Sequence, residues 1–172
     1  SNTSFKVGLA GEESGTNNNL HLYFYNDQEF RAHHYSNDLQ TNMVSTSEAY
    51  SSGTSVNEYG IFATMLESNA STGARRNYQN NHILGSMDDN AQLNSWNGAA
   101  LARYDFDGGS SYDYEDFSFA EVIIYSEALN DAQLNIVYNY LSEKYNIVIE
   151  NDSFNAPVGY DYYISGIGQE SG

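Results

Sequence analysis

The residues with the greatest capacity for chemistry are carboxylates gathered within residues 105–116. In chain order they are Asp105, Asp107, Asp113, Glu115 and Asp116. Like charges at this density repel one another unless something compensates them. Calcium is the natural compensator because it takes several oxygen ligands from flexible loops. The loop is not an EF-hand, which needs glycine at its sixth position, whereas Gly108 falls at the fourth. We predict a calcium site in this loop, or between it and Asp88 and Asp89; a solvated acidic loop is the alternative.

A second candidate site combines histidine, tyrosine and arginine on two alternating runs, residues 20–25 and 29–35. If they form a hairpin whose connection runs from Tyr25 to Glu29, one face collects the apolar side chains. These are Leu20, Leu22, Phe24, Phe30 and Ala32. The opposite face then carries His21, Tyr23, Arg31 and His33. Two neighbouring histidines make a transition metal conceivable, but without a third ligand the evidence is weak.

We predict that this polar-aromatic face binds a ligand, and that Trp96, the only tryptophan, contributes from a loop. Tyrosine and tryptophan suit sugars because each ring pairs an apolar face with a polar group. A solvated outer face is the alternative for the strands. For Trp96 the alternative is packing over a sheet edge.

The elements that must position these groups are short strands and one helix. Residues 119–125 (FAEVIIY) form an apolar, β-branched run that predicts a buried central strand. Asn130 can then cap a helix of about residues 130–146, with Gln133 reaching back to the cap. One apolar face of this helix is formed by Leu134, Val137, Tyr138, Leu141 and Tyr145. Further strands are predicted near residues 5–9, 59–66, 99–104 and 160–167, and a hairpin is predicted around Asn80 and Asn81.

The strand and helix in residues 119–147 resemble the end of the laminin-G-like, concanavalin A-type jelly roll of secreted bacterial multidomain proteins. The matching residues are Ala120, Glu121, Val122, Ile123, Ile124, Tyr125, Ala128 and Leu129, then Tyr140, Leu141, Lys144, Tyr145 and Ile147. Weaker similarity lies in LHLYFYNDQEF, ARRNYQNNHILGS and ALARYDFDGG, and YDYYISGIGQESG is similar to the opening of the next module in flavobacterial surface proteins. The resemblance implies an all-β, two-sheet antiparallel sandwich with one C-terminal helix, at a bacterial surface or outside the cell.

The sequence does not favour an enzyme. Glucanases on that fold place acids on one strand as E-x-D-x-x-E, so that they straddle the glycosidic bond. Glu115, Asp116 and Glu121 do not have this spacing. We therefore expect a non-catalytic protein.

Composition narrows the partners further. The net charge is −17, from 6 basic and 23 acidic residues, which disfavours nucleic acid and anionic membranes. No apolar run reaches the ~18 residues of a membrane span, so no membrane insertion is expected. The absence of cysteine excludes disulfides.

The expected organisation is a sandwich over residues 1–149, a linker at 150–159 and a tail at 160–172. Two functions follow. The first is an extracellular adhesion module that binds a glycan or cell-surface ligand and is steadied by calcium. The second is a structural subunit of a fibre. The resembling family has N-terminal strands that this sequence does not show, and a sandwich lacking strands has open edges. Residues 157–172 could fill such an edge in their own chain, or in a neighbour by self-association. A fragment of a longer protein, separated from its partner strands, is the remaining alternative.

Overall fold

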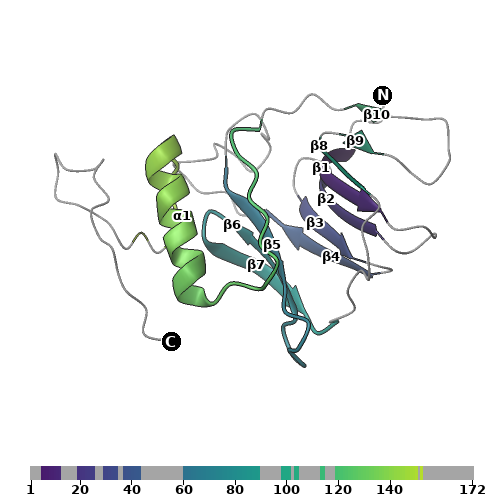
Figure 1. Ribbon diagram of the computed structural model, residues 1–172, viewed down its shortest axis with the longest axis horizontal. Coiled ribbons are helices and arrows are strands. Elements are labelled where there is room, and N and C mark those ends of the chain that lie inside the picture. Colours follow the sequence, from purple (N-terminus) through teal and green to yellow (C-terminus); the bar gives the residue numbers. More distant parts are fainter. Residues whose placement is uncertain are drawn as a thin grey trace.

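The computed structural model describes residues 5–12, 19–25, 29–34, 37–43, 60–89, 98–101, 103–104, 113–114, 119–150 and 152 of the chain. Most of this part is antiparallel β-structure, followed by one C-terminal helix (Figure 1). The predicted class, two packed antiparallel sheets with a C-terminal helix, is confirmed at this level. The predicted strand at residues 160–167 lies outside the described residues.

The first sheet has the strand order β4-β3-β2-β1-β8. Its strands are β1 (Phe5–Glu12), β2 (Asn19–Tyr25), β3 (Glu29–His34), β4 (Asn37–Asn42) and β8 (Gly98–Leu101). The second sheet, in the order β5-β6-β7, contains β5 (Phe62–Leu66), β6 (Arg75–Gln79) and β7 (His82–Met87). A short pair joins β9 (Arg103–Tyr104) to β10 (Asp113–Tyr114). The helix α1 is Asp131–Tyr145.

The register predicted for the β2–β3 hairpin is confirmed. Tyr25 pairs with Glu29, Phe24 with Phe30, and Leu22 with Ala32. Because side chains alternate along a strand, this register separates an apolar face from a polar-aromatic one. The apolar face meets the second sheet, where Phe62 lies 4.8 Å from Phe24 and 5.3 Å from Phe30 between ring centroids.

Polar groups also join the two sheets. The side-chain amide of Asn77, fully buried on β6, lies 3.3 Å from the Phe30 carbonyl oxygen. It lies 3.2 Å from both the Leu39 carbonyl oxygen and the Thr41 hydroxyl. Beside it, a Cβ added to Gly85 of β7 would lie 2.9 Å from Cγ2 of Thr41. Glycine is therefore needed at position 85 because β4 and β7 approach so closely.

The second sheet is the middle layer, between the first sheet and α1 (Figure 1). Its other face packs on the helix through a cluster of Ile61, Met65, Tyr78, Tyr138, Ile147 and Ile149. Leu134, Leu141 and Tyr145 of the predicted helix face pack against this cluster. Alternation along β6 therefore directs Tyr78 to the helix and Asn77 to the first sheet.

The local signals for the helix and the β6–β7 hairpin are confirmed. Asn130 caps α1 in a capping box with Gln133, whose side chain accepts from the Asn130 amide at 3.0 Å. The hairpin turns at Asn80 and Asn81, which have φ of 49° and 65°. Asparagine tolerates this left-handed conformation better than other residues with a side chain.

The central strand predicted at residues 119–125 is wrong. These residues form no strand, and Figure 1 shows them as an irregular stretch leading into α1. Strand propensity alone does not make a strand, because a ladder requires a neighbouring edge at the right distance and register. Among the described residues, the edge strands are β4, β8, β5 and β7, and residues 119–125 pair with none of them.

Candidate functional site

The polar-aromatic face of β2 and β3 brings its residues together as predicted. His21 pairs with His33 and Tyr23 with Arg31 across the strands. The guanidinium of Arg31 lies 5.9 Å from the centre of the Tyr23 ring and forms an ion pair of 2.7 Å with Glu29. The side chain of His33 lies outside the description.

The two described rings of this face, His21 and Tyr23, are covered. His21 is 2% exposed and Tyr23 is 6% exposed. A ring that stacks on a sugar needs a free face, so neither residue is available to a glycan in this conformation. Trp96 lies outside the described residues.

Most of the predicted calcium ligands cannot be placed. Asp105, Asp107, Glu115 and Asp116 lie outside the described residues, and Asp113 is described only by its backbone pairing with Tyr104. Asp88 and Asp89 already have partners: Asp88 accepts from the Gly73 amide at 2.8 Å, and Asp89 lies 3.7 Å from the Arg75 guanidinium. The described part of the chain contains no group of three or more His, Cys, Asp or Glu side chains able to hold a metal ion.

Arg75 is a feature that sequence reasoning missed. Its side chain is fully buried on β6, and burial lowers the pKa of its guanidinium, which the charge of Asp89 partly offsets. A buried charge is costly unless it is paired. Asp89 therefore has a structural function at this site, whether or not a cation binds near it.

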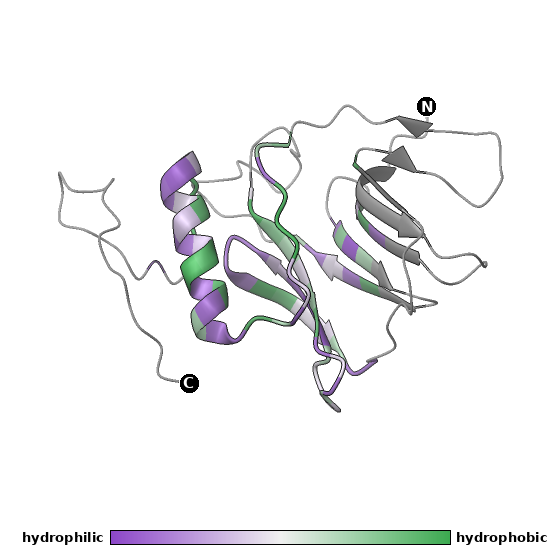
Figure 2. Ribbon diagram, in the orientation of Figure 1, coloured by the Kyte–Doolittle hydropathy of each residue, from purple (hydrophilic) through white to green (hydrophobic). Residues whose placement is uncertain are grey.

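The most unusual surface is residues 119–125, which we call the apolar segment. Five of its residues are exposed: Phe119 (40%), Val122 (42%), Ile123 (39%), Ile124 (64%) and Tyr125 (48%). Figure 2 shows this stretch as a largely hydrophobic connection between the sheets and α1. Val122, Ile123 and Ile124 are neighbours in sequence and all three are partly accessible to solvent.

Helix α1 holds the beginning of the apolar segment. The hydroxyl of Tyr145 lies 3.3 Å from the Ala120 carbonyl oxygen and 3.0 Å from the Glu121 carboxylate. Lys144 donates to Glu121 at 2.8 Å and to the Tyr140 hydroxyl oxygen at 2.9 Å. Its ammonium group also lies 5.1 Å from the centre of the Tyr140 ring. These contacts fix where the segment starts and leave the residues from Val122 onward exposed.

The charges at this anchor compensate one another. The hydrogen bond from Lys144 lowers the pKa of Glu121, with a further contribution from Tyr145. The hydrogen bond to Glu121 raises the pKa of Lys144 in turn, and the Tyr140 hydroxyl adds to this. The single carboxylate of the apolar segment is thus neutralised locally, so the segment presents an apolar surface on a strongly acidic protein.

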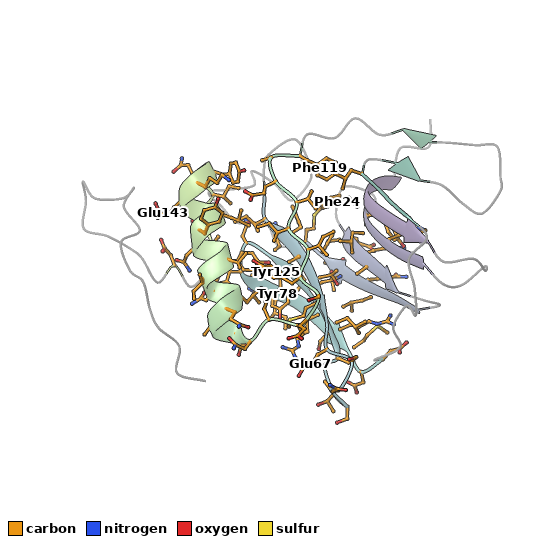
Figure 3. The ribbon with its side chains drawn as sticks, in the orientation of Figure 1. Phe24, Glu67, Tyr78, Phe119, Tyr125 and Glu143 are labelled. Atoms are coloured by element: carbon orange, nitrogen blue, oxygen red, sulfur yellow. The ribbon has the colours of Figure 1, made fainter. Side chains whose placement is uncertain are left out.

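Side chains labelled in Figure 3 show how β6, the apolar segment and α1 are arranged. Tyr78 faces the helix, Tyr125 belongs to the apolar segment, and Glu143 lies on the side of α1 away from the sheets. Sequence reasoning identified residues 119–125 as apolar and β-branched but placed them inside a sheet. Their exposure goes together with the absence of any pairing between this segment and the described strands.

No protein-family model, curated protein or solved structure matches this chain. The resemblance to the laminin-G-like jelly roll therefore stays a prediction. In the part of the chain that the structure describes, no helix has the length and apolar character needed to cross a membrane.

Proposed function

We propose that this protein is a non-catalytic extracellular assembly module that accepts an extended strand along residues 119–125. The observation that carries the proposal is the exposure of five consecutive or near-consecutive large apolar side chains in a segment of high β-propensity. Soluble proteins rarely leave such a stretch uncovered, and an exposed, strand-prone segment is a template for pairing with another chain.

Strand addition would satisfy this segment in two ways. Its backbone groups would gain ladder hydrogen bonds, which give affinity, and its alternating side chains would select the partner. The five side chains are about half exposed. Burying what remains open contributes about 1 kcal/mol each, or roughly 5 kcal/mol in total. That is enough to support association once backbone pairing is added, although ordering the partner offsets part of it.

The finer fold fits the same proposal. We infer a concanavalin A-like jelly roll, in which the resemblance places residues 119–125 inside a sheet. An incoming strand would return the segment to that environment. The anchor from Lys144 and Tyr145 to residues 120 and 121 holds the segment ready for pairing.

Glycan binding receives less support. Of the residues predicted to bind a glycan, His21 and Tyr23 are buried, and Arg31 is paired with Glu29. His33 and Trp96 are the remaining members of that site. Calcium in residues 105–116 remains compatible with an assembly module as a stabilising ion.

Self-association of the full chain tests the proposal. Ile124→Asp places a carboxylate on the most exposed residue of the segment, and Ile136→Asp is the matched control, because Ile136 is 58% exposed on α1 outside the segment. Sedimentation velocity over a concentration series should show association of the wild type and of Ile136→Asp, and a loss for Ile124→Asp. Equal association of both variants would refute the proposal.

A further inference from the structure

We propose that the strand accepted by the apolar segment is residues 160–167 of a second copy of this chain. This inference rests on the proposed function and names its partner. It makes the protein a donor at one end and an acceptor at another.

The sequence of residues 160–167, YDYYISGI, is eight residues long and the acceptor is seven residues long. Tyr160, Tyr162 and Ile164 alternate with Asp161, Tyr163 and Ser165, which predicts a strand with one apolar side. Neighbouring side chains of the apolar segment are accessible, with Val122 42%, Ile123 39% and Ile124 64% exposed, so they can contact that row. The only carboxylate of the apolar segment, Glu121, is paired with Lys144, so its electrostatic repulsion of Asp161 is weakened.

The point where the tail leaves the folded part also bears on the partner. Ile149 is buried in the core, and the Glu150 amide donates to the Asn80 carbonyl oxygen at 2.8 Å. Asn81 adds hydrogen bonds to the Glu150 carbonyl oxygen at 3.0 Å and to Asn135 at 2.7 Å. The chain is therefore held beside α1 and the β6–β7 turn at Glu150, before the linker and the tail at residues 160–172.

This anchor limits how residues 160–167 could dock within their own chain. Glu150 is held at the β6–β7 turn, close to Asn135 in the first part of α1, whereas the start of the apolar segment is held by Tyr145 at the end of the helix. Residues 151–159 span at most about 30 Å when fully extended, so docking within one chain requires that this length bridge the β6–β7 turn and the apolar segment. Donation to a neighbour has no such requirement.

This contact joins two different surfaces, so it is heterologous. A heterologous contact that does not close into a ring builds an open chain of subunits. With a net charge of −17 the subunits repel one another at long range. Since salt screens that repulsion while an apolar contact persists, association should strengthen as the salt concentration rises.

The test uses two full-length variants, each with one defective end. Ile124→Asp disables the acceptor, and Ile164→Pro disables the donor, because proline lacks the backbone N–H that a ladder needs. Gln169→Pro, outside residues 160–167, is the matched control for the proline. Circular dichroism and thermal unfolding confirm that each variant keeps the fold of the wild type.

The expected result is complementation. Sedimentation should show wild type and Gln169→Pro growing into oligomers, and each end-defective variant should associate on the order of a hundredfold more weakly. An equimolar mixture of Ile124→Asp and Ile164→Pro should form dimers that grow no further, because only one donor and one acceptor remain.

The other outcomes separate the alternatives. If Ile164→Pro associates like the wild type while Ile124→Asp does not, the apolar segments pair with each other, and the tail proposal falls while the proposed function stands. A monomeric wild type whose residues 119–125 lose amide protection only in Ile164→Pro would show docking within one chain and overturn exchange between copies. Association unaffected by Ile124→Asp overturns both.

Discussion

Replacing Gly85 with alanine tests the closest approach between the two sheets. The new Cβ would lie 2.9 Å from Cγ2 of Thr41, well below the ~3.5–4.0 Å of an unstrained contact between carbon atoms. Thr41 is not free to turn its methyl group away. Its hydroxyl donates to the Phe30 carbonyl oxygen at 2.6 Å and accepts from the Asn77 amide at 3.2 Å.

Two responses are open to the Gly85→Ala protein, and their costs are similar. If β4 and β7 move apart, overpacking of this kind costs about 1–3 kcal/mol. If Thr41 rotates, two buried hydrogen bonds weaken at about 1 kcal/mol each. The free energy of unfolding should therefore fall by roughly 1–3 kcal/mol in either case.

A double-mutant cycle shows whether the clash is the cause. Thr41→Ser removes Cγ2 and keeps the hydroxyl, and alone it should cost about 1 kcal/mol for the lost methyl group. The double variant should lose about 1 kcal/mol less stability than the sum of the two single losses, because the clashing Cγ2 atom is gone. Gly73→Ala is the control: Gly73 has φ of 58° and would be strained by alanine for a reason unrelated to Thr41.

Equilibrium unfolding in urea gives the four free energies of each cycle. The coupling energy should be near 1 kcal/mol for Gly85 with Thr41 and near zero for Gly73 with Thr41. Additive effects at Gly85 would mean that β4 does not pack on β7 there, and the described arrangement of the two sheets would be refuted.

Four further results are expected. Tyr138→Phe should raise the free energy of unfolding by about 1 kcal/mol, because its buried hydroxyl has no hydrogen-bond partner in the described structure; a clear loss in urea unfolding would contradict this. Asn77→Asp buries a carboxyl group against carbonyl oxygens, which raises the pKa of that carboxyl in the folded protein. The stability of the variant relative to wild type should therefore be greatest below about pH 4 and fall as pH rises through the folded pKa. Equal urea midpoints at pH 4 and 8 would count against this. Because the pKa of Glu121 is lowered in the folded protein, its contact with Lys144 stabilises the anchor at pH values above the ordinary glutamate pKa of 4.5. This contribution is lost as pH falls through the folded pKa. At that low pH, amide exchange in residues 119–125, corrected for intrinsic rates, should approach that of Glu121→Gln. Removing calcium with a chelator should lower the thermal midpoint if residues 105–116 bind it, and an unchanged midpoint opposes the site.

Local signals predicted those elements whose stability depends on nearby residues. The capping box of Asn130 and Gln133 closes within one helical turn, and the Asn80–Asn81 turn needs only two residues that accept a left-handed backbone. The β2–β3 register followed from alternation, because a one-residue slip would turn Phe24 and Phe30 away from the core.

Tertiary structure alone decided which faces are covered. Residues 119–125 have the composition of a buried strand, yet they pair with no described strand and five of their side chains are exposed. His21 and Tyr23 have the pattern of an outer face, yet they are buried. Periodicity records which side chains share a face, whereas burial depends on what is placed against that face, and this is set by contacts between segments far apart in the sequence.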